Sequence, residues 1–461
     1  MQHEGARLRM AHFSDLHYSP GHLAEAERCF GFAVEDAIAA ECGVGVVSGD
    51  STDHRLDAHT PALGALARRI HQLSASMPLL MLQGTFSHEP AGTLDLFRLI
   101  GARYPVYVAD RIHQVALRAG VFIPSEGPLF TRPELDRLVA GGLPDVVFTC
   151  VPTVNKAVLA SVAGVAAAAT ALGDHLSTFL VAAGAVNQQL RGFGIRTVGV
   201  SHGTVNGCLT EHGVPMAGFD HEFTIGALFA AQCDAFMLGH IHRCQQWERE
   251  GRVVAYPGSI GRFHYGEEGE KSYLQWSVAP GNAVATPIVT PARETVCIDF
   301  NGPPDMDQLA LAAATADDKF FRIRWTIDEE HRQLVDRDAI CALFGAAAEL
   351  KLEGRVLPAV RSRAEGISRA ATLAEKVERW GELAAVDTSR LVEYLPVLES
   401  LDAQAIVDLE LAELADAVVP AVSVLPPPAA PAVTPPAPAP APATAPVLDW
   451  LTDDLFAGEP A

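Results

Sequence analysis

Five short runs of apolar residues recur between positions 8 and 238, and each is followed within a few positions by polar side chains. The runs cover residues 8–13, 44–47, 79–82, 198–200 and 235–238. Each has the length and composition of a buried strand, and two stretches with apolar residues at helical spacing, 23–40 and 62–73, lie between them. This alternation predicts an α/β fold. In such a fold the carboxyl ends of neighbouring strands open onto one crevice, where substrate or cofactor usually binds.

The polar residues that follow these runs are mainly aspartate and histidine. They are Asp15, His17, Asp50, His202, His240 and His242. Carboxylate oxygen and imidazole nitrogen together suit Mn²⁺, Fe²⁺ or Zn²⁺ better than Ca²⁺ or a metal that prefers thiolates. A pair of such ions about 3.5 to 4 Å apart needs a bridging carboxylate and can drive in-line displacement at phosphorus. Asp50 is the predicted bridge.

These residues and their neighbours follow the block order of a known family. The blocks that resemble the calcineurin-like metallophosphoesterases are Asp15 with His17, Gly49-Asp50 with Asp53, His88-Glu89, His202, and Gly239-His240 with His242. The resemblance implies a sandwich of β-sheets flanked by helices, and two divalent metal ions that activate a water molecule for attack on phosphorus. It also implies that His88 is a catalytic acid or charge stabiliser. Asp53 is either a second catalytic residue or a residue that orients a histidine.

One block departs from the family pattern. Where the family has Gly-Asn-His, this chain has the sequence GTFSHE at residues 84–89, so the amide oxygen that reaches the second metal is missing. A hydroxyl oxygen can take its place, and two candidates remain. Alignment on the histidine selects Ser87, and alignment on the glycine selects Thr85. We favour Ser87, because its neighbour His88 must stay aimed at the substrate.

A second resemblance concerns residues 256–271, YPGSIGRFHYGEEGEK. This segment, together with residues 11–17, is similar to the SbcD-type DNA repair nucleases, and the similarity covers about residues 8–280. It implies Mn²⁺-dependent exonuclease activity on double-stranded DNA and endonuclease activity on single strands or hairpins, with a coiled-coil SbcC-like ATPase as partner. Arg262 and His264 follow the YPGS turn and are the candidates for contact with substrate phosphate.

Two further interpretations are retained. The same metal core is found in phosphatases and small-molecule phosphodiesterases, although the YPGS segment argues against them. A scaffold that has lost activity at residues 84–89 is the other alternative, and the intact ligand set at the remaining positions argues against it. The sequence leaves open whether the chain is a monomer or a homodimer.

Charge and composition favour a cytoplasmic protein with partners. The eight cysteines form no CxxC pair, which is typical of buried thiols in a reducing compartment, and no apolar segment predicts export or membrane insertion. The net charge of −22 opposes DNA binding. Eleven acidic residues and no Lys or Arg follow Arg390, so half of that excess belongs to the C-terminal part. The remaining acidity suggests that a partner subunit helps to hold DNA.

The chain divides into five predicted segments. They are a nuclease domain at 1–280, a capping domain at 281–357, a helical partner-binding segment at 358–418, a Pro/Ala linker at 419–446 and an acidic-aromatic tail at 447–461. In the cap, a strand is predicted at 319–327 and a helix near 336–352. Helices are predicted at 362–383 and 389–418, with a kink or a helix start at Pro396. The tail is predicted to fold on a further protein partner, because its large apolar residues would otherwise face water.

Overall fold

The computed structural model describes residues 7–54, 56–100, 102–154, 165–215, 223–267, 269–358, 367–399, 404 and 407. These residues form two compact units. The first consists of the described residues within 7–326 and 334–355, and the second consists of 327–333 and the described residues from Val356 onward. The candidate site lies in the first unit.

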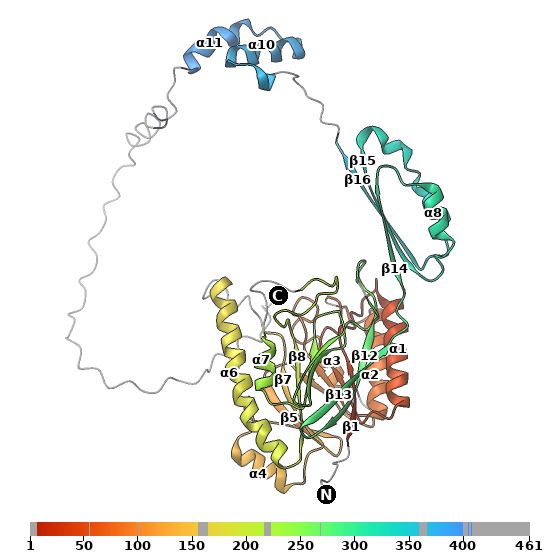
Figure 1. The fold of residues 1–461 in the computed structure, drawn as a ribbon, viewed down its shortest axis with the longest axis vertical. Coiled ribbons are helices and arrows are strands. Elements are labelled where there is room, and N and C mark those ends of the chain that lie inside the picture. The colour runs from red at the N-terminus through yellow and green to blue at the C-terminus, as the bar shows by residue number, and fades with distance from the viewer. Residues whose placement is uncertain are drawn as a thin grey trace, which may run out of the picture. The chain divides into compact units, whose positions relative to one another are not determined.

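Two β-sheets form the centre of the first unit (Figure 1). One has the order β13 (Asn282–Val289), β12 (Ser272–Ala279), β1 (Leu8–Phe13), β2 (Val44–Val47), β3 (Leu79–Leu82) and β4 (Val106–Ala109). The other has the order β10 (Gln245–Arg249), β11 (Arg252–Tyr256), β9 (Ala235–Gly239), β8 (Arg196–His202), β7 (Val146–Val151), β5 (His113–Arg118) and β6 (Val121–Pro124). Strands β1 to β4 are mutually parallel, as are β7, β8, β9 and β11.

The two sheets pack face to face because both faces of their central strands are apolar. In β3, Leu80 and Leu82 join the core between the sheets, whereas Leu79 and Met81 point to the opposite face. Side chains alternate between faces along a strand, so a continuous apolar run is what a strand needs when it is covered on both sides. Trp276 of β12 is also part of the core between the sheets.

Helices cover the outer face of each sheet, and the predicted α/β class is confirmed. Helices α1 (Leu23–Ala39) and α2 (Pro61–Ser76) pack on the sheet that contains β1, while α6 (Val165–Gly192) and α7 (Ile225–Ala230) pack on the other (Figure 1). Two shorter helices are also described in this part, α3 (Asp95–Arg98) and α4 (Arg132–Ala140). Among the residues that the structure describes, none of the helices combines the length and the apolar character needed to span a bilayer.

A small three-stranded sheet follows the sandwich. It has the order β14 (Thr295–Asn301), β15 (Phe320–Asp328) and β16 (Glu349–Leu357), with α8 (Met306–Ala313), a 3-10 turn at Glu329–Leu334, and α9 (Arg337–Leu343) between the strands. The predicted strand at 319–327 is present. The predicted helix near 336–352 is wrong in its second half, because α9 ends before Gly345 and residues 349–357 form β16 beside β15.

Two helices are described in the C-terminal part, namely α10 (Leu373–Ala384) and α11 (Ser389–Glu399), after a short 3-10 turn at Ile367–Arg369. Thr372 begins α10 with a capping box that involves Glu375. Pro396 lies inside α11, so it does not start a helix. The first predicted helix is therefore wrong at 367–372, which are described and are not α-helical, whereas Gln404 and Val407 of the second are helical. The other residues of the predicted helices, the Pro/Ala linker and the acidic-aromatic tail lie outside the described residues.

Candidate metal centre

The first candidate metal group consists of Asp15, His17 and His242. Nε2 of His17 lies 3.0 Å from Nε2 of His242, and Oδ1 of Asp15 lies 4.0 Å and 3.8 Å from these two atoms. Ligands about 2.0 to 2.2 Å from one ion are about 3 to 3.6 Å apart, so these three atoms fit a divalent metal after small adjustments. Burial, assisted by His242, lowers the pKa of His17 to about 3, which keeps its ring neutral and its lone pair available.

The second candidate group consists of Asp50, His202 and His240. Oδ2 of Asp50 lies 3.2 Å from Nε2 of His202. Burial lowers the pKa of His202, but the Asp50 carboxylate outweighs burial and raises the pKa to about 10. A cation bound between these residues would therefore compete with a proton. The donor set of one carboxylate and two imidazoles fits the same divalent ions as the first group.

Each group combines residues from both sheets, because the strands end at the same edge of the sandwich. Asp15 and Asp50 follow β1 and β2, whereas His202 ends β8 and His240 follows β9. The backbone ties these loops together. The N–H of His240 donates to both Asp15 carboxylate oxygens at 3.2 and 3.0 Å, and the N–H groups of Leu16 and His17 donate to the carbonyl oxygen of Asp50.

Four of the six predicted ligands have a left-handed backbone conformation. The φ angles are 51° at Asp15, 45° at His17, 52° at Asp50 and 97° at His240. Non-glycine residues rarely adopt such angles, and a cluster of them is typical of functional sites where surrounding structure holds the strain. These turns lie in the loops that bring the four side chains into the two candidate metal groups.

Three glycines allow the strand ends to approach one another. A Cβ atom at Gly84 would overlap the backbone N and Oδ1 of Asp50, and one at Gly49 would overlap the His202 ring. A Cβ at Gly239 would overlap the Ser14 hydroxyl. These positions therefore require glycine for space.

The ligand histidines are oriented through their second ring nitrogen. Nδ1 of His202 donates to the carbonyl oxygen of Ser48 at 2.8 Å, and Nδ1 of His242 donates to Oε1 of Glu267 at 2.8 Å. Nζ of Lys271 lies 2.8 Å from Oε2 of Glu267, and both of these residues are buried. Such partners fix the tautomer and direct Nε2 toward the metal position.

His88 is held beside the first group by Asp53. Nδ1 of His88 lies 3.0 Å from Oδ1 of Asp53, and the His88 ring centroid is 5.0 Å from that of His17. The hydrogen bond to Asp53 raises the pKa of His88, which favours the protonated form. The same carboxylate oxygen lies 2.8 Å from Nδ1 of His54. Nε2 of His22 lies 4.0 Å from Oδ2 of Asp53.

Glu89 fixes the loops that carry Asp50 and His88. Its two carboxylate oxygens accept from the N–H of Ser51 at 2.5 Å and from the N–H of Gly84 at 2.6 Å. Burial and the nearby Asp50 charge raise the pKa of Glu89 to about 7. Glu89 thus connects the ends of β2 and β3 directly.

The structure brings together all six predicted ligands and places His88 and Asp53 next to them. It favours Thr85 over Ser87 as the replacement for the family's asparagine. The Thr85 hydroxyl oxygen lies 3.2 Å from both Oδ2 of Asp50 and Nε2 of His202, and its N–H donates to Asp50 at 2.6 Å. The Ser87 side chain is exposed. The glycine-anchored alignment is better because Gly84 must stay in contact with Asp50.

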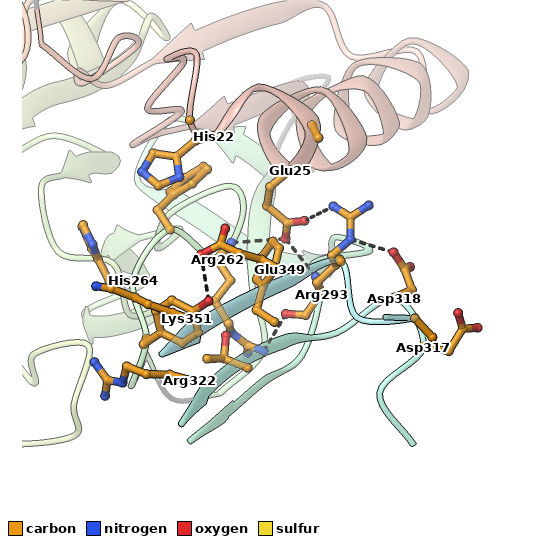
Figure 2. Close-up of a pocket in the computed structure, with 18 residues that line it drawn as sticks. His22, Glu25, Arg262, His264, Arg293, Asp317, Asp318, Arg322, Glu349 and Lys351 are labelled. Atoms are coloured by element: carbon orange, nitrogen blue, oxygen red, sulfur yellow. Dashed lines mark hydrogen bonds and ion pairs between the residues drawn. The ribbon is translucent and has the colours of Figure 1, made fainter. Parts of the chain in front are cut away.

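The two predicted phosphate contacts differ in position. The His264 ring stacks on His242, with centroids 5.8 Å apart and an interplanar angle of 7°. The Arg262 guanidinium donates to the carbonyl oxygens of Arg293 and Gly269, and it lines a pocket beside the centre (Figure 2).

Sequence reasoning gave no individual role to Glu267, Lys271, Glu89 and His22, although Glu89 belongs to one of the matched blocks. Glu267 and Lys271 lie within the GEEGEK segment, so the segment itself was the available signal. A ligand histidine usually needs an acceptor at its second nitrogen, and that rule would have drawn attention to a buried glutamate.

No family model matches the chain. Over 85 residues it is 34% identical to the uncharacterized metallophosphoesterase YhaO of Bacillus subtilis (strain 168), and this match spans 18% of the chain and 19% of that protein. The chain therefore matches about a fifth of the length of this curated relative. This partial match is to a protein described as a metallophosphoesterase.

Two solved structures show low overall similarity. GAP50, the anchor in the inner membrane complex of Plasmodium, is 13% identical, with a TM-score of 0.39 over 62% of this chain and 85% of that chain. A dimetal phosphatase from Danio rerio is 12% identical, with a TM-score of 0.37 over 61% of this chain and 99% of that chain.

Proposed function

We propose that the chain is a two-metal phosphodiesterase that cleaves DNA, as the nuclease subunit of a complex with a coiled-coil SbcC-like ATPase. The single observation that carries the hydrolase activity is the pair of adjacent donor groups with His88 beside them. Carboxylates and imidazoles converge there from the ends of both sheets. This arrangement suits phosphoester hydrolysis with divalent ions, for which we propose Mn²⁺.

Bound divalent ions would polarise the phosphodiester and lower the pKa of water at this site. The protein residues do the positioning. Asp15, His17 and His242 would hold one ion, and Asp50, His202 and His240 would hold the other. Glu267 and the Ser48 carbonyl oxygen keep two of the imidazoles turned with Nε2 inward.

His88 supplies the proton or the positive charge. Because Asp53 accepts from Nδ1, the Nε2 atom is left for the substrate, and the raised pKa of His88 keeps a proton available near neutral pH. His88 can therefore protonate the leaving 3′-oxygen or stabilise charge on the phosphoryl oxygens. Asp53 acts as a positioning residue for His88.

DNA as substrate is supported by the YPGS-to-GEEGEK segment, because it contributes the Glu267–Lys271 pair to the centre itself. An ATPase partner is supported by the apolar surface of α10 and α11. The exposed large apolar residues on these two helices include Leu373, Trp380, Leu383, Leu391 and Tyr394. Exposed apolar side chains gathered on two helices are typical of a surface that binds another helix.

The hydrolase proposal is tested with the purified full chain and Mn²⁺ on three substrates: bis(p-nitrophenyl) phosphate, p-nitrophenyl phosphate and linear double-stranded DNA. We expect diester and DNA cleavage in the wild type, no cleavage by Asp50→Ala, and a loss on the order of 10² to 10⁴ in His88→Ala with metal content intact. Undiminished cleavage by Asp50→Ala would refute the two-metal site. Cleavage of the monoester alone would assign the chain to the phosphatases.

The partner proposal is tested separately, by co-purification with a coiled-coil ATPase encoded beside this chain. Replacement of Trp380 and Tyr394 by glutamate should abolish co-purification and leave hydrolysis of bis(p-nitrophenyl) phosphate unchanged. Glu378→Gln on the same helix serves as the matched control. Full retention of the ATPase by the double variant would rule out the apolar surface of α10 and α11 as the binding site for the ATPase.

A further inference from the structure

Lys271 is a buried lysine that connects the two sheets beside the first candidate metal group. It directly precedes β12 of one sheet, and its carbonyl oxygen accepts from the N–H of Thr290, which follows β13. Its side chain is 1% exposed. The side chain contacts His242, which belongs to the loop after β9 of the other sheet. Lys271 therefore links the two sheets at the edge where the candidate ligands gather.

Three acceptors surround the Lys271 ammonium. Nζ lies 2.8 Å from Oε2 of Glu267, donates to the carbonyl oxygen of His242 at 3.0 Å and donates to Oγ of Ser259 at 2.9 Å. The Ser259 hydroxyl donates its own proton to the carbonyl oxygen of Gly261 at 2.9 Å, so toward Lys271 it can only accept. Three acceptors use all three N–H groups of an ammonium ion, so the hydrogen-bonding capacity of Lys271 is fully used.

Each of these acceptors also holds or belongs to His242. Glu267 accepts from Nδ1 of the His242 ring at 2.8 Å, and the N–H of Ser259 donates to the His242 carbonyl oxygen at 3.3 Å. The third acceptor is that carbonyl oxygen itself. Lys271 thus acts on His242 at two places, on the side chain through Glu267 and on the backbone directly.

The charge of Lys271 by itself disfavours a metal ion at the first group. An ammonium ion repels a divalent cation, and in a buried site this repulsion is only weakly screened by salt. The ammonium does balance the Glu267 carboxylate, but a neutral glutamine could accept from His242 without a counterion. Charge alone therefore gives no reason for a lysine at this position, whereas the placement of three N–H donors does.

We propose that Lys271 is a positioning residue for the first metal ion. Its ammonium fixes the His242 loop of one sheet against Asp15 and His17 of the other, so that the three ligand atoms stay at distances that one ion can bridge. The proposal rests on the metal centre of the proposed function. It assigns to Lys271 a role that is separate from the compensation of the Glu267 charge.

The test uses Mn²⁺ calorimetry with the purified full chain, and Glu267→Gln is the reference variant. Glu267→Gln/Lys271→Met removes the ammonium without leaving a carboxylate unpaired, because an unpaired buried charge would itself destabilise the fold. We expect the double variant to bind one of the two ions about ten- to a hundredfold more weakly than Glu267→Gln, because His242 loses its backbone contact. The other ion should bind as in Glu267→Gln. Lys319→Met is the matched control, since Lys319 pairs with Glu294 at 2.7 Å and lies outside the metal groups.

The direction of the change in affinity separates three explanations. A positioning role predicts weaker binding of one ion. If Lys271 acts only through charge, Glu267→Gln/Lys271→Met should bind Mn²⁺ as tightly as Glu267→Gln or more tightly, since the repulsion is removed. If Lys271 only stabilises the fold, the double variant should melt at a lower temperature without metal and keep both Mn²⁺ affinities. Either of the last two results would overturn the proposal.

Ser259→Ala provides a second measurement that changes no charge. It removes one acceptor of the Lys271 ammonium and retains the backbone N–H that donates to His242. We expect the affinity for the same ion to fall about two- to tenfold, because one hydrogen bond that places Nζ is lost. If Glu267→Gln/Lys271→Met does not fold, an unchanged Mn²⁺ affinity of Ser259→Ala would overturn the proposal by itself.

Mn²⁺ binding is measured without substrate, so the proposed nuclease activity is tested separately. If the wild type binds two Mn²⁺ ions but cleaves neither bis(p-nitrophenyl) phosphate nor DNA, the nuclease proposal fails and the calorimetry still decides the role of Lys271. If the wild type binds no Mn²⁺, both proposals fail.

Discussion

Thr85→Val is the substitution that most directly tests the altered second metal group. Valine keeps the shape of threonine and retains the backbone N–H that donates to Asp50 at 2.6 Å. Only the hydroxyl is removed, and that oxygen lies 3.2 Å from both Asp50 and His202. The perturbation is therefore confined to one oxygen atom in contact with two candidate ligands.

The expected size of the change in metal affinity follows from these contacts. A hydroxyl has a single proton, so in the absence of metal it can donate one hydrogen bond, and the charged Asp50 is the stronger acceptor. A hydrogen bond to a charged group contributes about 1.5 to 3 kcal/mol. Loss of that interaction, or of a weak metal ligand at the same place, should reduce the affinity for the second ion by about 10- to 100-fold.

The assay is a Mn²⁺ titration of bis(p-nitrophenyl) phosphate hydrolysis, accompanied by elemental analysis and a melting curve. Thr85→Val should need more Mn²⁺ for half-maximal rate, while Ser87→Ala should match the wild type. Thr85→Asn introduces the family's amide and should restore metal affinity. If Thr85→Val needed the same Mn²⁺ concentration as the wild type for half-maximal rate, and Ser87→Ala needed more, our assignment would be refuted. Ser87 would then be the residue that replaces the family's asparagine.

Three further predictions concern residues around the centre. Glu267→Gln weakens the orientation of His242, so metal affinity measured by calorimetry should fall by about 10- to 100-fold, and an unchanged value would contradict that role. Burial lowers the pKa of His12 to about 3, so the unfolded chain binds more protons below about pH 6.5 and the free energy of unfolding should fall there by about 1.4 kcal/mol per pH unit. Urea denaturation from pH 7 to pH 5 should show a shallower fall in the free energy of unfolding for His12→Gln than for the wild type. Equal slopes of the two proteins would exclude this contribution from His12. Gly84→Ala should lower the free energy of unfolding by about 1 to 3 kcal/mol and abolish activity through overlap at the site. In α2 there is space for a methyl group at Gly64, so Gly64→Ala should instead stabilise the folded protein by up to about 1 kcal/mol. Equal melting temperatures of Gly84→Ala and Gly64→Ala would argue against the overlap at Gly84.

Much of the sandwich could be predicted because its signals are local. Apolar runs mark β1, β2, β3, β8 and β9, and within each of the two sheets the parallel strands bring their carboxyl ends to one edge. The ligand residues directly follow these strands, so their grouping within each sheet follows from topology, whereas the packing of the two sheets brings the two groups together.

Other features depend on contacts that sequence spacing does not encode. The preference for Thr85 over Ser87 rests on the packing of Gly84 against Asp50, which is a contact across two loops. The helix expected near 336–352 had suitable apolar spacing, but pairing with β15 makes its second half a strand. Likewise, Arg262 and Arg322 are sixty residues apart in the chain, and only the fold places them in one pocket.

The left-handed turns at Asp15, His17, Asp50 and His240 set a limit on engineering this protein for heat resistance. Each such residue costs about 1 to 2 kcal/mol relative to an ordinary conformation, and glycine relieves most of that cost. A selection for thermal tolerance alone would therefore tend to enrich glycine at these positions and produce robust but inactive proteins. Screens for hardier variants should accordingly score catalysis in the same round as survival on heating.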